Sequence, residues 1–162
     1  MADRKVHYEA AFEQLLRDRG VPYVAVDEAK RALFAQSALK SFDFVVYGGK
    51  AGNLLVDVKG RSARGGQSLQ TWVSQQDVQD LSQWESIFGE GFRGLLLFAY
   101  WVDPPLLDDP ELVRHGDRAY RMVGVDLEDY RNHMRRRSPR WGTVAIPAGD
   151  FRQLARPIDQ WL

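Results

Sequence analysis

Two apolar runs separated by a glycine-rich segment constrain the fold of this chain more than any other feature. The first run spans residues 42–47 (FDFVVY) and the second spans residues 53–59 (NLLVDVK). The segment that joins them, GGKAGN, carries three glycines. Apolar runs of this length on either side of a glycine-rich turn are typical of paired strands. The sequence therefore predicts a β-hairpin.

The hairpin carries three ionisable residues, Asp43, Asp57 and Lys59. Because alternate residues of a strand share a face, Asp57 and Lys59 should point the same way while Val58 points into the core. In a paired hairpin Asp43 can lie near Asp57. Two carboxylates and an ammonium at one place suit a divalent cation held against a phosphate. The alternatives are a water-facing acid at a strand edge and an ordinary ion pair between Asp57 and Lys59.

Length and composition limit the remaining possibilities. The chain has 162 residues, of which 44% are hydrophobic, so we expect one domain, 1–162, with a substantial core. It contains no cysteine, which excludes disulfides, thiolate metal sites and a cysteine nucleophile. No apolar run reaches membrane-spanning length and the N-terminus has no secretory pattern. We therefore expect a cytoplasmic protein that does not bind membranes.

Charge is balanced overall but not locally. Lys+Arg and Asp+Glu are equal at 22 each, which gives no support to general nucleic-acid binding. One segment nevertheless holds six basic residues and no acid: Arg131, His133, Arg135, Arg136, Arg137 and Arg140. A local basic patch of this kind can bind phosphates. The alternative is a solvated helix end, where arginines are favourable.

The order of expected elements indicates an α/β fold with a mixed central sheet flanked by helices. Besides the hairpin, strands are expected at 22–26, 71–73, 92–102, 119–125 and 141–147, and helices at 5–19, 75–88 and 127–136, with possible helix at 28–34 and a last helical turn at 150–154. Residues 61–70 and 104–116 should be loops. A capping box at 74–77 and Asp126 should begin two of the helices, and Gly20 and Gly89 should end two.

Taken in order, these residues resemble the PD-(D/E)xK nuclease superfamily. Its motif is an acid on one strand and acid-x-Lys on the next, after a helix that bears a glutamate. Glu9, Asp43 and the run Asp57-Val58-Lys59 match these positions, while Phe42 stands where a proline is usual. The resemblance implies a restriction-endonuclease-like fold.

Finer spacing is similar to that of archaeal Holliday-junction resolvases. Glu9, Phe12, Leu16 and Gly20 follow the pattern of their first helix, and the elements up to residue 101 follow their order. The resemblance covers residues 5–101 and leaves 102–162 as a C-terminal extension that contains the arginine-rich segment. The string HYEAAFE at 7–13 also resembles a bacterial family named HYExAFE, whose function is not established.

The superfamily resemblance implies a magnesium-dependent endonuclease that acts on DNA, with Mg²⁺ or Mn²⁺ as cofactor. Asp43, Asp57 and the Val58 carbonyl would hold the ion. Lys59 would orient the attacking water and offset charge on the phosphate. Glu9 would support the metal sphere.

Several cations lie where they could contact the nucleic-acid backbone: Lys40, Arg61, Arg64, Arg135 and Arg136. Solubility alone would also explain them. Trp72 is the best candidate for base stacking, and the alternative is that its ring belongs to the core. His7 could be a general base or could make a local hydrogen bond. Resolvase-like enzymes act as dimers, so a homodimer is expected.

Two other functions stay open at this point. The first is a catalytically silent nuclease-like domain that binds nucleic acid or a protein partner. The second is a plain α/β domain that binds a protein through its arginine-rich segment, which would require the acids to be unrelated in space.

Overall fold

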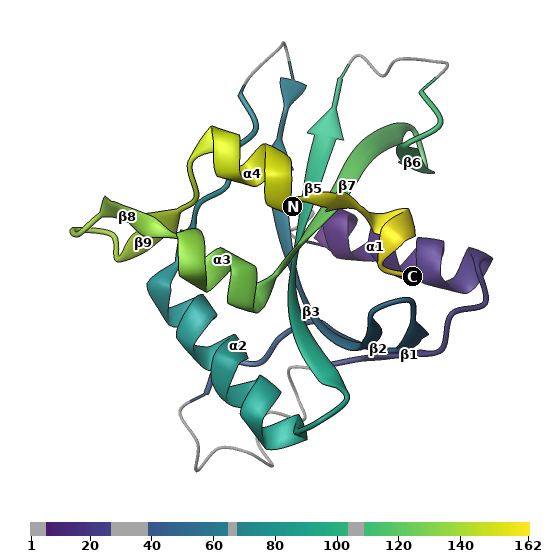
Figure 1. Ribbon diagram of the computed structural model, residues 1–162. Coiled ribbons are helices and arrows are strands. Elements are labelled where there is room, and N and C mark those ends of the chain that lie inside the picture. Colours follow the sequence, from purple (N-terminus) through teal and green to yellow (C-terminus); the bar gives the residue numbers. More distant parts are fainter. Residues whose placement is uncertain (1–5, 27–38, 65–67, 104–108) are drawn as a thin grey trace.

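A mixed β-sheet forms the centre of the molecule. The computed structural model describes residues 6–26, 39–64, 68–103 and 109–162 (Figure 1). The sheet order is β1 (Tyr23–Ala25), β2 (Phe44–Gly49), β3 (Gly52–Ser62), β5 (Phe92–Val102), β7 (Arg118–Asp126) and β10 (Arg156–Pro157), and β6 (Leu112–His115) pairs with β7. A small second sheet has the order β4 (Val73–Ser74), β9 (Thr143–Ala145), β8 (Arg135–Ser138).

Helices cover both faces of the main sheet, as expected. The helix α1 (Val6–Asp18) lies on one face, with the 3₁₀ turn η3 (Ile158–Gln160) beside it (Figure 1). The other face is covered by α2 (Gln75–Phe88), α3 (Leu127–His133) and α4 (Ala148–Leu154). The predicted α/β fold with a mixed central sheet is confirmed. The last third of the chain contributes β7 and β10 to this same sheet.

The expected hairpin is formed by β2 and β3. The two strands are antiparallel, with Phe44 opposite Val56. Gly48 and Gly52 adopt φ angles of 71° and 91°, a backbone region that favours glycine, which explains the glycine-rich turn. β3 then pairs in parallel with β5, with Asp57 beside Leu96, and α2 lies between them in the chain.

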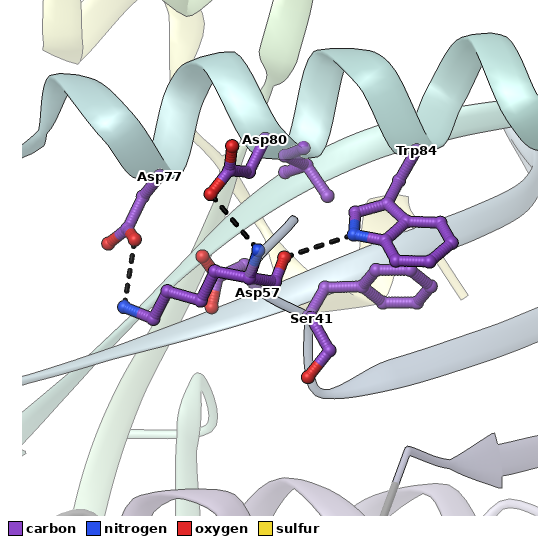
Figure 2. A pocket seen from close by; sticks show the side chains of 8 residues that line it. Ser41, Asp57, Asp77, Asp80 and Trp84 are labelled. Carbon is purple, nitrogen blue, oxygen red and sulfur yellow. Dashed lines mark hydrogen bonds and ion pairs between the residues drawn. The ribbon is translucent and has the colours of Figure 1, made fainter. Parts of the chain in front are cut away.

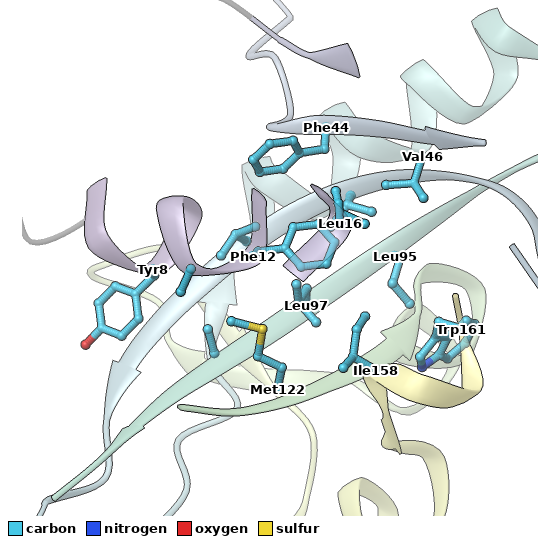
Figure 3. Packing of buried hydrophobic residues seen from close by; sticks show 14 of the residues in the cluster. Tyr8, Phe12, Leu16, Phe44, Val46, Leu95, Leu97, Met122, Ile158 and Trp161 are labelled. Carbon is cyan, nitrogen blue, oxygen red and sulfur yellow. The ribbon is translucent and has the colours of Figure 1, made fainter. Parts of the chain in front are cut away.

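Alternate residues of the hairpin divide between two cores. Phe44, Val46 and Leu54 face α1, where they pack with Phe12 and Leu16, both fully buried (Figure 3). Burial of such side chains contributes roughly 1.5–3 kcal/mol each. The intervening residues face α2. The apolar residues of α1, spaced one helical turn apart, thus pack against every second residue of the strands.

The C-terminal third departs from the expected elements. α3 ends at His133, and Arg135 and Arg136 lie in β8 instead of a helix, because the backbone becomes extended at Met134 (φ −65°, ψ 147°) and pairs with β9. The strand expected at 141–147 is limited to Thr143–Ala145, and β6 occupies part of an expected loop.

Three further points qualify the sequence expectations. Phe88, in the last turn of α2, is 37% exposed although its spacing from Leu81 and Trp84 predicts an inward side chain. The possible helix at 28–34 lies outside the described residues. None of the described helices is both long and apolar enough to span a membrane.

Candidate active site

The candidate site lies where β2 and β3 separate. The amide of Asp43 makes the last backbone bond of the pair, to the Val56 carbonyl at 3.0 Å. One step further, the Val58 amide donates to the Asp43 carboxylate (Oδ2) at 2.7 Å. The Asp43 side chain therefore takes the place that the next strand residue would have occupied. This arrangement fixes its carboxylate against β3.

Asp43 and Asp57 share this place. Asp43 is half-buried, and its carboxyl group interacts with the Asp57 carboxyl group. Burial, followed by the negative charges of Asp57 and Glu9, raises the pKa of Asp43 to about 8, although the Val58 amide opposes the shift. At neutral pH a proton or a cation therefore favours this pair of acids.

Lys59 lies between two carboxylates. Its ammonium (Nζ) is 3.0 Å from Asp57 Oδ2 and 2.5 Å from Asp77 Oδ2. Burial by itself would lower the pKa of Lys59, but the charges of Asp57 and Asp77 outweigh burial and raise it. The lysine is thus charged, and its head group is fixed beside Asp57, as its position on the same face of β3 predicted.

Asp77 is a site residue that the sequence assigned only to a capping box. The predicted cap is formed, because Ser74 Oγ accepts a hydrogen bond from the Asp77 amide at 3.0 Å. The carboxylate itself pairs with Lys59 and, at 2.8 Å, with Lys40. Although burial acts in the opposite direction, these two cations lower the pKa of Asp77 to about 2. An acid in the first turn of the helix that follows the site was the available signal.

Lys40 joins the segment before β2 to α2. Its backbone amide donates to Asp80 at 3.2 Å, and its carbonyl accepts from Trp84 Nε1 at 3.0 Å (Figure 2). With Asp57, these residues line a cavity of about 10 Å³, room for one water molecule. Lys40, a candidate phosphate contact, pairs its ammonium with Asp77 while half of its side chain stays exposed.

The oxygen donors fit a hard cation only in part. Within the described ranges, no three Asp, Glu or His side chains are placed to hold one ion together. Asp43 and Asp57 do adjoin, and Mg²⁺ is commonly bound through one or two carboxylates with water and substrate phosphate. Because the Val58 amide faces Asp43, its carbonyl lies on the same strand edge and could add a further donor. Glu9 acts on Asp43 through its charge.

The expected nucleic-acid contacts fall into two groups. Arg61 and Arg64 lie at the end of β3 and just beyond it, and they line a second cavity with Trp72 and His7. The Arg61 guanidinium is 4.1 Å from the Trp72 ring centre. His7 Nδ1 lies 2.8 Å from the Tyr120 hydroxyl, a contact distant in sequence instead of local.

The other group comprises Arg135 and Arg136. They are exposed on β8, at the edge of the small sheet. Neither residue lines the pocket beside the carboxylates or the second cavity.

Comparison with solved structures finds the same fold elsewhere. The chain is similar to Hjc, a Holliday junction resolvase from the archaeal hyperthermophile Archaeoglobus fulgidus, with a TM-score of 0.57 and 15% sequence identity. The similarity covers 96% of this chain and 97% of that one, so it extends into residues 102–162. It confirms the restriction-endonuclease-like fold.

Comparison by sequence gives no relative. No protein-family description matches the chain, and no curated protein matches it. The likeness of residues 7–13 to the HYExAFE family therefore gains no support.

Proposed function

We propose that this protein is a metal-dependent nuclease that hydrolyses phosphodiester bonds in DNA. The observation that carries the proposal is the convergence of Asp43 and Asp57 on β3. The Val58 amide holds the Asp43 carboxylate at 2.7 Å, and the neighbouring Asp57 carboxylate lies 3.0 Å from the Lys59 ammonium. Two adjacent acids at the open end of a hairpin are costly unless a cation or a proton lies between them. The fold shared with a Holliday junction resolvase supports DNA as substrate.

Each residue has a distinct role in this proposal. Asp43, Asp57 and the Val58 carbonyl would hold Mg²⁺ or Mn²⁺, which supplies positive charge to a phosphate oxygen and lowers the pKa of water. Lys59 stays charged between its two acids and would orient the attacking water and offset charge developing on the phosphate. Glu9 would act on the same centre from α1, through its effect on Asp43.

A catalytically silent DNA-binding domain is the second candidate. It is favoured by the double ion pair of Lys59, whose side chain is only 11% exposed. A lysine held by Asp57 and Asp77 has less freedom to assist a water molecule. The same experiment separates the two candidates, because a silent domain would bind DNA without cutting it.

The test combines cleavage with a readout that does not depend on activity. Purified protein is incubated with Mg²⁺, Mn²⁺ or EDTA and with four-way junctions, linear duplex, single-stranded DNA and RNA. We expect metal-dependent cleavage of DNA that falls about a hundredfold or more in Asp57→Asn and Lys59→Ala. The melting temperature should rise with Mg²⁺ in the unaltered protein but not in Asp57→Asn.

Asp117→Asn is the matched control, since Asp117 is exposed in the turn between β6 and β7. Cleavage that persists in Asp57→Asn would identify a contaminant and refute the nuclease assignment. Binding of junctions without cleavage, together with no thermal response to metal, would establish the silent domain. Molar mass measured by light scattering, with and without junction DNA, tests the proposed homodimer.

A further inference from the structure

A second cavity, of about 440 Å³, lies at the end of β3, the strand that carries Asp57 and Lys59. Three arginines and two tryptophans dominate its lining: Arg61, Arg64, Arg118, Trp72 and Trp101. None of the described residues that line it is acidic. Its volume lies in the range of small-molecule sites. The cavity therefore combines positive charge with aromatic surface.

The cavity continues the surface that carries the carboxylates. Arg61 lies on the same strand as Lys59, about 7 Å further along, and side chains two residues apart share a strand face. Tyr8 lines the cavity and belongs to α1, the helix that carries Glu9. A chain-like ligand could thus occupy both places at once.

Arg61 shows that the positive charge is not balanced inside the protein. Among the described residues, its terminal nitrogens donate to two backbone carbonyls, of Gly60 at 2.8 Å and of Trp72 at 2.6 Å. Its Nε is buried and has no hydrogen-bond partner within the described part of the chain. Burial lowers the pKa of the Arg61 guanidinium. A buried cation is usually paired with an anion, so the arrangement favours an anionic ligand.

Each tryptophan is contacted by two guanidinium groups. Arg64 and Arg118 lie 4.4 and 4.7 Å from the ring centre of Trp101. Arg61 and Arg137 lie 4.1 and 5.2 Å from the ring centre of Trp72. Like charges gathered in this way repel one another.

One of these arginines is free to move. Arg64 is exposed, and its Nε hydrogen bond to Ser62 Oγ is long, at 3.3 Å. It can leave the Trp101 ring for a phosphate and thereby uncover an aromatic face.

We propose that this cavity binds an unstacked nucleotide of a single-stranded segment, with its base against Trp101 or Trp72 and its phosphate on Arg64 and Arg118. A base inside a duplex is stacked on its neighbours and cannot enter a recess, whereas unpaired bases stack readily on aromatic rings and guanidinium planes. The inference rests on the proposed function for its ligand class, nucleic acid. It narrows the substrate to DNA with an unpaired stretch next to the scissile phosphate.

Binding can be tested without hydrolysis. Fluorescence anisotropy in EDTA compares three labelled probes: a ten-nucleotide oligothymidylate, an abasic strand with the same number of phosphates, and a blunt duplex hairpin. We expect the thymidylate to bind at least tenfold more tightly than the abasic strand. Trp101→Ala should weaken thymidylate binding about tenfold and leave abasic binding unchanged, since stacking is lost but the phosphates remain.

The chain offers a close control for each variant. Trp141 is 70% exposed, lies 5.1 Å from the Arg140 guanidinium and does not line the cavity, so Trp141→Ala removes an equivalent pair elsewhere. Arg64→Gln should weaken thymidylate and abasic binding equally, about threefold or more, while Arg152→Gln on α4 should change neither. Arg64 is exposed, so this variant tests the cavity even if Trp101→Ala fails to fold.

The outcomes separate this inference from the nuclease proposal. Equal binding of thymidylate, abasic strand and duplex, or equal effects of Trp101→Ala and Trp141→Ala, would overturn the nucleotide cavity while leaving cleavage untouched. Selective thymidylate binding that survives in Asp57→Asn supports the cavity whether or not the protein cuts DNA. Cleavage of fully paired duplex as fast as DNA with an unpaired stretch would also overturn it.

Discussion

Replacing Asp43 with asparagine tests whether the two adjacent acids are a site that a cation completes. The pKa of Asp43 is about 8 in the folded protein and 3.8 without such surroundings. For an acid whose pKa is raised on folding, the contribution to stability is fully present below pH 4. It is lost as the pH rises towards 8, because the unfolded chain then releases a proton that the folded protein must hold.

The magnitude follows from the size of the shift. At pH 7 Asp43 is mostly protonated in the folded protein. In the unfolded chain it is ionised, because pH 7 is about three units above its pKa there, and each unit corresponds to about 1.4 kcal/mol of folding free energy. The full loss of folding free energy between low pH and pH 7 is therefore about 4 kcal/mol. Because part of the Asp43 shift comes from neighbouring charges, the part of this free energy that the substitution recovers is about 2–4 kcal/mol. Asparagine keeps an oxygen for the Val58 amide, so this hydrogen bond is not lost.

Urea denaturation in EDTA at pH 4 to 8 measures the effect. We expect Asp43→Asn to match the unaltered protein near pH 4 and to exceed its free energy of unfolding by about 2–4 kcal/mol at pH 7 to 8. Mg²⁺ should stabilise the unaltered protein increasingly as the pH rises and should not stabilise the variant. Asp117→Asn, in an exposed turn, should follow the unaltered protein throughout. A variant that is less stable at pH 7, or whose difference does not vary with pH, would refute the reasoning.

Three other substitutions test the surroundings of the site. Asp77→Asn should destabilise the protein by about 2 kcal/mol at pH 7 in urea denaturation and should lower the pKa of Lys59. The folded pKa of Asp77 is about 2, so its carboxylate adds stability above pH 4 that is lost as the pH falls. Gly60→Ala places a β-carbon 2.1 Å from the Tyr8 ring, so we expect a loss of about 1–3 kcal/mol that a second substitution, Tyr8→Ala, reduces. Ser74→Ala should cost about 1 kcal/mol through loss of the helix cap, and thermal unfolding should show no such loss if the cap is unimportant.

The sequence predicted those features that neighbouring residues determine. The β2–β3 hairpin depends on a two-residue apolar period and on Gly48 and Gly52 in the turn, all within twenty residues. The caps of α2 and α3, Ser74 and Asp126, bond amides two or three residues away. Pairing of the strands then brings Asp43 to Asp57, which is why that contact was accessible to prediction.

Features formed by distant segments were not accessible in the same way. Lys59 meets Asp77 only because α2 returns across the sheet and β5 pairs in parallel with β3. Arg135 and Arg136 carry no strand pattern of their own, and β8 exists because β9 provides a partner for its backbone. Arg118 joins the second cavity from β7, and no local motif marks it.

Net charge conceals how the charges are arranged. The chain is neutral overall, yet two carboxylates, Asp43 and Asp57, interact at one place, while a cavity with no acid among its described lining residues gathers Arg61, Arg64 and Arg118. Lys59 belongs to the acidic side, where its single charge is shared by Asp57 and Asp77. A cation between the carboxylates and a phosphate among the arginines would relieve both repulsions at once. Phosphodiester substrates bound with a divalent ion bring these two charges together, and for this reason the arrangement favours a nuclease over a domain that binds a protein partner.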